Sequence, residues 1–267
     1  MMRDMTKGAP LGHLFLYAAP LLLGNWLQLA YNAVDSIIAG RFIGQDALAA
    51  EGVAGPVMNL VILAISGLCI GAGVLMSEAF GAGETARLKE TLATTLLFGA
   101  LLCCGAAAAG CLLTPWILRA TAVPSSIFEI TGVYLRITFL GAPFTFFYNA
   151  LAAGLKSVGD SKTPLYFLIL TSALNIGLDL LFIIPFQMGV LGAALATDIS
   201  QVISGVLSFI YLSRKFDVLK MQKSDFAYSK KACARLLGIG IPMGLQCSIT
   251  AIGSVIMQWA VNVPVSY

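Results

Sequence analysis

Charged residues are scarce in this chain of 267 residues. Asp, Glu, Lys and Arg make up 11% of it, against about 25% in an ordinary soluble domain, whereas 58% of the residues are hydrophobic. A soluble domain is therefore excluded, and we expect an all-α integral membrane protein. The net charge of +3 indicates no nucleic-acid partner, because the basic residues lie in short loops between apolar runs.

Histidine and paired cysteines are almost absent. His13 is the only histidine and stands at the edge of the first apolar run, so no Ser-His or His-metal arrangement is expected inside the membrane. The six cysteines form no Cys-x-x-Cys pair, and all but Cys233 lie in apolar segments, as packing residues do. The sequence therefore predicts neither an enzyme nor a bound cofactor.

Seven apolar runs are long enough to cross a bilayer as helices. They cover residues 11–40, 53–80, 91–113, 127–154, 165–184, 190–212 and 236–263. We expect residues 1–213 to form a six-helix transmembrane lobe, 214–235 a basic cytoplasmic linker, and 236–267 the first span of an incomplete second lobe. A weak internal repeat, which aligns Pro20 with Pro242, suggests that this second lobe is inverted or pseudo-symmetric.

Glycine and proline mark contacts and turns along these runs. Gly67, Gly71 and Gly73 in the second run would let neighbouring helices approach closely. Pro115 and Pro124 are predicted to flank the turn between the third and fourth runs.

The basic residues predict the topology. Counted over alternate connections, one side of the membrane holds thirteen Lys and Arg residues and the other holds two, Arg41 and Arg119. By the positive-inside bias, we expect a multi-pass plasma-membrane protein with a cytoplasmic N-terminus and with its last residues outside.

The first apolar run carries a row of polar side chains. Asn25, Gln28, Asn32 and Asp35 follow at steps of three, four and three residues, which places them on one helical face. A carboxylate is costly in hydrocarbon, so this face should meet a protein interior or a watery cavity. Pro20 removes a backbone hydrogen bond from the same helix and marks a bending point.

Polar residues of other runs reach the same depth as Asp35. Asn175 and Asp179 share a face of the fifth run, Thr197 lies at matching depth in the sixth, and Tyr134 in the fourth. Two carboxylates in a low-dielectric site can share a proton, and carboxylate, amide and hydroxyl oxygens also suit Na⁺. Coupling by H⁺ or by Na⁺ thus stays open, as does a purely structural polar network. The neighbouring Asp198 points elsewhere on its helix and is left out of the group.

Four stretches carry a family resemblance. They are YNAVDSIIAGRFIG (31–44), GDSKTP (159–164), LNIGLDLLFI (174–183) and GAALAT (192–197). In these, and in its six spans with a basic link, the chain resembles the N-terminal lobe of the multidrug and toxic compound extrusion (MATE) family. The resemblance implies efflux of amphipathic or cationic small molecules in exchange for H⁺ or Na⁺. It also implies a cation site at Asp35, Asn175, Asp179 and Thr197, a supporting network of Tyr31, Tyr134 and Asn149, and a helix bend at Pro20.

The chain also departs from that family. MATE proteins have twelve spans in two six-helix lobes, whereas this chain stops one span into the second, and its final VPVSY does not match. We therefore expect a truncated product or a split-gene half, which is either non-functional or dependent on a second chain for the missing lobe. A lipid or polysaccharide flippase is the other alternative, although it would favour a basic groove and only Arg136 lies within a span. Membrane lipid is an expected partner in every case.

Overall fold

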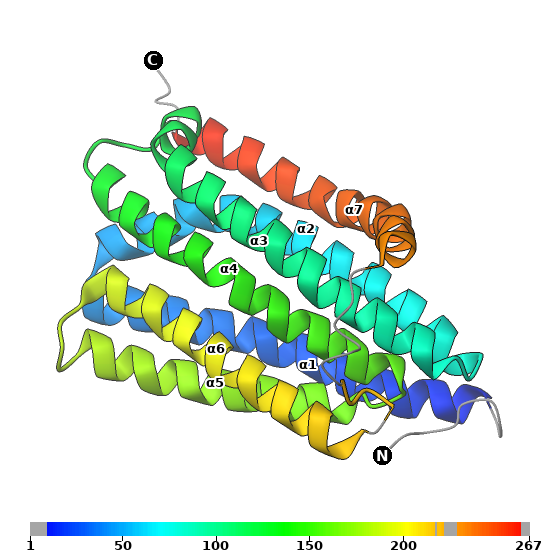
Figure 1. Ribbon diagram of the computed structural model, residues 1–267. Coiled ribbons are helices and arrows are strands. Elements are labelled where there is room, and N and C mark those ends of the chain that lie inside the picture. The colour runs from blue at the N-terminus through cyan, green and yellow to red at the C-terminus, as the bar shows by residue number, and fades with distance from the viewer. Residues whose placement is uncertain (1–9, 217, 222–228, 263–267) are drawn as a thin grey trace.

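The computed structural model describes residues 10–216, 218–221 and 229–262, and within these ranges every regular element is a helix. The elements are α1 (Pro10–Ile38), the π-helix η1 (Ala39–Ile43), α2 (Gln45–Gly81), α3 (Thr85–Ala120), α4 (Phe128–Ser157), α5 (Lys162–Ile183), α6 (Gly189–Lys215) and α7 (Lys230–Asn262). The predicted all-α class is confirmed. Figure 1 shows the helices lying side by side along one common direction.

Six helices in the described ranges, α2 to α7, are long and apolar enough to cross a membrane. The remaining helix, α1, has 29 residues and a length of about 44 Å. The chain is therefore a multi-pass membrane protein of six candidate spans and a further helix.

Some helix ends lie well outside the predicted limits. Helix α2 begins at Gln45, eight residues before the predicted start, so η1 and Gly44 alone connect it to α1. Pro115 was predicted to flank a turn, and this is wrong, because α3 continues through it to Ala120. In lipid there is no water to bind backbone groups that lose their helical hydrogen bonds. Ending the helix would therefore cost more than the one hydrogen bond that a proline removes, and the helix continues. Pro124 does lie in the α3–α4 connection, as predicted.

Successive helices alternate in direction (Figure 1). The start of α1, the α2–α3 and α4–α5 turns and the start of α7 lie at one end of the bundle. The α1–α2, α3–α4 and α5–α6 connections lie at the other. The basic loops predicted to share one side thus share one end. That this end faces the cytoplasm remains a prediction, as does the division at residues 213 and 235.

Helix α4 holds the centre of the bundle and packs against α2, α3 and α6. Its Phe146 is fully buried in the main apolar core, and a Cβ on Gly99 of α3 would meet the Phe146 ring. Helix α1 lies at one edge, where it packs against α5.

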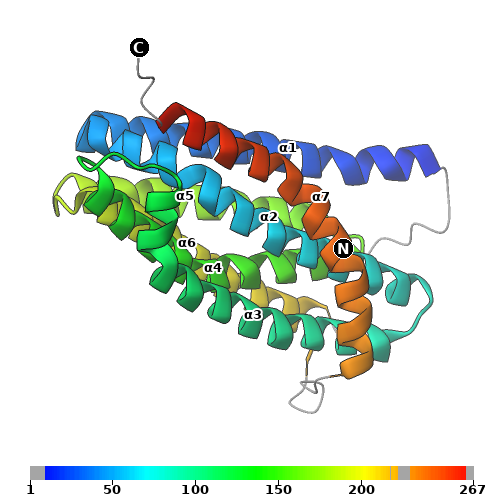
Figure 2. The same ribbon diagram turned by 90° about the horizontal axis from the view of Figure 1, so that it is seen from above.

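Helix α7 crosses α2 obliquely (Figure 2), and glycines line the crossing. A Cβ on Gly67 would collide with the backbone of Gly244, and one on Gly71 would lie 2.8 Å from Cα of Gly240. The predicted close approach at Gly67 and Gly71 is therefore confirmed, and the partner is α7. Gly73 makes only ordinary contact, since its Cβ would lie 3.7 Å from that of Ala153.

We expect Gly67→Ala to separate α2 from α7, because the backbone of Gly244 cannot yield as a flexible side chain can. Overpacking of this kind costs about 1–3 kcal/mol, measured as the free energy of unfolding in detergent. Gly55→Ala is the matched control on the same helix, since nothing lies within 4 Å of its added Cβ. Equal losses in the two variants would contradict a tight α2–α7 contact.

Candidate cation site

Three helices bring the predicted site residues together. Helix α1 packs on α5, α5 packs on α6, and η1 continues α1 into contact with α2 and α6. Ile38, Ile183 and Ala193, one from each of the three helices, form a small apolar cluster near the bundle end that holds these connections. This cluster fixes the ends of α1 and α5, and therefore the positions of Asp35 and Asp179 one turn before them.

The carboxyl groups of Asp35 and Asp179 are electrostatic neighbours. Asp179 is 0% exposed and Asn175, one turn earlier on α5, is 1% exposed. Asn175 donates a hydrogen bond from Nδ2 to Oγ1 of Thr197, over 3.1 Å. Tyr31 of α1 also reaches Thr197. The structure thus joins five of the predicted residues across three helices.

Most oxygens of this group have no hydrogen-bond donor in the described part of the chain. Asp35 Oδ1, Asn175 Oδ1 and both carboxylate oxygens of Asp179 are buried and unpaired. Buried polar atoms are normally paired, and each unpaired one costs about 1–3 kcal/mol. All four unpaired atoms are hydrogen-bond acceptors. A proton or a hard cation would therefore satisfy them.

Glu51 of α2 belongs with this group, although sequence reasoning missed it. Its carboxylate interacts electrostatically with Asp35 and Asp179, and its Oε1 is buried without a donor. Tyr134 of α4 lies close to Glu51, Asp35 and Tyr31. The second apolar run was predicted to begin at residue 53, two residues after Glu51. Extending the second apolar run back to Gln45 would have placed this acid inside a spanning helix.

Three further residues considered in the sequence analysis are Asn149, Asp198 and Pro20. Asn149 stands fifteen residues beyond Tyr134 on α4, about 22 Å along the helix, and donates to the backbone oxygen of Thr145 over 2.8 Å. The carboxylate of Asp198 packs against Gly141 of α4 and interacts electrostatically with Tyr134 of the same helix. Pro20 lies inside α1, which runs as one helix from Pro10 to Ile38. The predicted roles of Asn149 and Pro20 stay predictions.

The donor set limits which ion the site would suit. The donors brought together here are carboxylate, amide and hydroxyl oxygens. Such oxygens suit Na⁺, which would be shared among the carboxylates, Asn175 and Thr197, whereas transition metals favour nitrogen and sulfur ligands. A cavity of about 420 Å³ opens at the same end of the bundle, bordered by Ile43, Ile183 and Gly189.

A multi-pass helical bundle with buried, unpaired carboxylates in its interior has the architecture of a membrane transporter rather than of a structural membrane anchor. The MatE family model matches residues 20–181, which is most of the chain. The chain belongs to this family.

Named relatives and a solved structure are consistent with this family assignment. The chain is 32% identical over 263 residues to the probable multidrug resistance protein YpnP of Bacillus subtilis, covering 97% of this chain and 58% of the relative. It is 24% identical to the multidrug export protein MepA of Staphylococcus saprophyticus, covering 91% and 54%. It superposes with a TM-score of 0.83 and 26% identity on a MOP superfamily transporter from Pyrococcus furiosus, whose binding pocket is described as reversed in polarity. That match covers 90% of this chain and 53% of the other. The chain thus spans about half the length of the relatives it matches.

We expect Asp179→Asn to raise the free energy of unfolding in sodium-free alkaline buffer, where neither carboxyl group of the Asp35–Asp179 pair holds a proton. The change removes a buried charge without changing the side chain's shape, and the new amide can donate to Asp35 Oδ1. The expected gain is about 1–3 kcal/mol, measured by denaturation in detergent.

Glu129→Gln, at the exposed start of α4, is the control and should change stability by less than about 0.5 kcal/mol. A loss of stability in Asp179→Asn alone would mean that the native carboxylate is already satisfied.

Proposed function

We propose that this chain is a lobe of a cation-coupled efflux transporter for amphipathic or cationic small molecules, and that it has no enzymatic role. The observation that carries the proposal is the set of buried, unpaired acceptor oxygens shared by Asp35, Asn175 and Asp179. The names of YpnP and MepA, which describe multidrug resistance and multidrug export, support the substrate class. Because those relatives are about twice as long, transport would need further protein, in the same polypeptide or from a second chain.

The coupling ion would bind where these oxygens meet. A proton on Asp35 or Asp179 would turn one carboxylate into a donor for the other and remove their mutual repulsion. A sodium ion would instead be shared among the carboxylates, the Asn175 amide and the Thr197 hydroxyl. Either ion would offset the cost of the unpaired oxygens, so its binding and release would change the contacts that hold α1 against α5.

Helix α1 is suited to transmit such a change. Before Pro20, the Tyr17 hydroxyl donates to the backbone oxygen of Lys156 at the end of α4, over 3.1 Å. After Pro20, about 22 Å further along the axis, Asp35 stands in the cation site. One part of the helix is thus held by α4 while the other responds to the ion, and Pro20 lies between them, where a backbone hydrogen bond is missing.

Where a second copy of this chain supplies the further protein that transport needs, we expect Asp35→Asn to abolish ion-coupled efflux. The experiment places the 267-residue chain in vesicles that lack other pumps, loads a fluorescent organic cation, and imposes a proton or a sodium gradient. The asparagine cannot take up a proton and carries no charge for Na⁺, so efflux should fall at least about tenfold, while Glu129→Gln should keep the wild-type rate. The gradient that drives the wild-type chain identifies the ion.

Cation binding by the purified chain gives a readout that does not require transport. Radioactive sodium uptake and proton release in detergent should both be measured, and one of them should depend on Asp35. If neither ion binds the wild-type chain, the polar cluster is a structural network and the proposal fails.

Glu51→Gln should weaken cation binding by a smaller factor, about two- to tenfold, because Glu51 adds negative potential beside Asp35 without belonging to the Asn175–Thr197 pair. The measurement is the same binding titration in detergent. An unchanged affinity would remove Glu51 from the site, and a complete loss would make it a principal ligand.

A further inference from the structure

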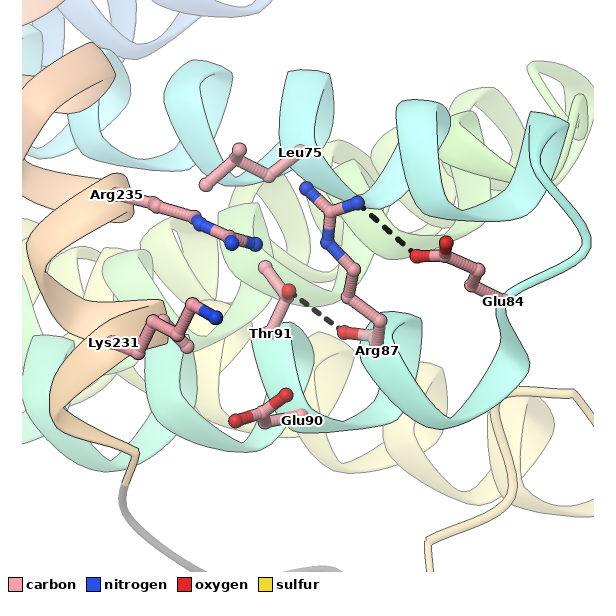
Figure 3. A pocket seen from close by; sticks show the side chains of 8 residues that line it. Leu75, Glu84, Arg87, Glu90, Thr91, Lys231 and Arg235 are labelled. Carbon is pink, nitrogen blue, oxygen red and sulfur yellow. Dashed lines mark hydrogen bonds and ion pairs between the residues drawn. The ribbon is translucent and has the colours of Figure 1, made fainter.

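A second polar cavity lies at the opposite end of the bundle from the cation site. It has a volume of about 330 Å³ and lies between the first turns of α3 and of α7 (Figure 3). Its lining residues are Leu75, Glu84, Arg87, Glu90, Thr91, Lys231, Ala232 and Arg235. This is the end that holds the basic connections, and no part of the proposed cation coupling uses it.

Three cationic side chains converge on this cavity. Figure 3 shows the guanidinium groups of Arg87 and Arg235 and the amine of Lys231 pointing into the space between α3 and α7. Lys231 and Arg235 are one turn apart on the same face of α7, and both are exposed. In the described part of the chain neither has an ion-pair partner. Like charges that face each other across a cavity repel unless an anion lies between them.

Two acidic side chains near this cavity form ion pairs with Arg87. Glu84 accepts a hydrogen bond from Nη1 of Arg87 over 3.1 Å, and Glu78 lies 3.6 Å from Nη2. These contacts hold Arg87 in place and leave it further N–H donors. Glu90, below Thr91, has its carboxylate on the side of the cavity where Lys231 lies (Figure 3). The lining thus holds three cationic side chains and two acidic ones, which leaves one positive charge in excess. Of these three described cations, Lys231 and Arg235 of α7 are the two that the acidic side chains do not bind.

An apolar row continues from the cavity along α7. A Cβ on Gly238, three residues after Arg235, would meet nothing within 4 Å, so the helix surface is open there. Beyond it Ile241, Leu245 and Ile249 follow at helical spacing and are 54%, 62% and 69% exposed. The same face of α7 thus joins a basic group at the bundle end to an exposed apolar strip.

We propose that this cavity binds the phosphate headgroup of an anionic phospholipid, with an acyl chain lying along α7. Arg and Lys side chains form strong charge-assisted hydrogen bonds with phosphate oxygens, and Arg presents two parallel donors to them. A free phosphate would use the basic group alone, whereas a phospholipid would also cover the apolar strip. Basic pockets between transmembrane helices on the side that carries positive charge suit such headgroups.

The test measures lipid binding to the purified 267-residue chain. In neutral detergent, native mass spectrometry would follow the titration of phosphatidylglycerol, phosphatidylcholine and inorganic phosphate. We expect phosphatidylglycerol to bind at least about tenfold more tightly than phosphatidylcholine, and the double variant Lys231→Gln/Arg235→Gln to lose about tenfold in that affinity. Unchanged helical circular dichroism and thermal unfolding would show that the double variant is folded.

Lys230→Gln is the matched control, because Lys230 is the adjacent exposed cation on α7 but does not line the cavity. It should keep the phosphatidylglycerol affinity within about twofold. Equal binding of the two lipids, equal losses in the control and the double variant, or full competition by inorganic phosphate at the same concentration as the lipid would each overturn the assignment to a phospholipid.

Discussion

The cost of an unpaired carboxylate in a low-dielectric interior is the constraint on which this structure depends. Asp179 is fully buried and both its oxygens lack a donor among the described residues, so a charge on this carboxylate raises the free energy of the bundle. Other parts of the fold offset that cost. Phe146 fills the centre beneath α3, and close glycine contacts fasten α7 to α2. The helices can therefore hold an unfavourable group in place instead of rearranging around it.

Much of the site could be predicted from the sequence because helical spacing is strict. Asn175 and Asp179 are four residues apart, so they had to share a face, and Thr197 could be matched to them by its distance from the α5–α6 turn. Counting depth worked because the helices run side by side and alternate in direction. Nothing local could show that Asn175 donates to Thr197 and leaves its own oxygen unpaired, since that depends on side-chain rotamers across two helices.

The misses came from helix limits that were set too narrowly. The second apolar run was predicted to begin at residue 53, and Glu51, two residues earlier, was overlooked. The third run was predicted to end at residue 113, and Pro115 was wrongly assigned to a turn. In lipid an interrupted helix has no water to complete its backbone hydrogen bonds, so the penalty for stopping exceeds the penalty for including one proline. Helix propensities taken from soluble proteins therefore predict helices that are too short in such a chain.

The connection between α1 and α2 has a mechanical consequence. It contains no free loop, because η1 follows α1 directly and only Gly44, with φ of 120°, separates η1 from α2. Few backbone torsions are therefore available to absorb a rotation of α1 about its own axis. A rotation of α1 about its axis that moved Asp35 would be transmitted through η1 to the first turns of α2. These turns carry Glu51. A rotation of α1 that displaced Asp35 would therefore also displace Glu51.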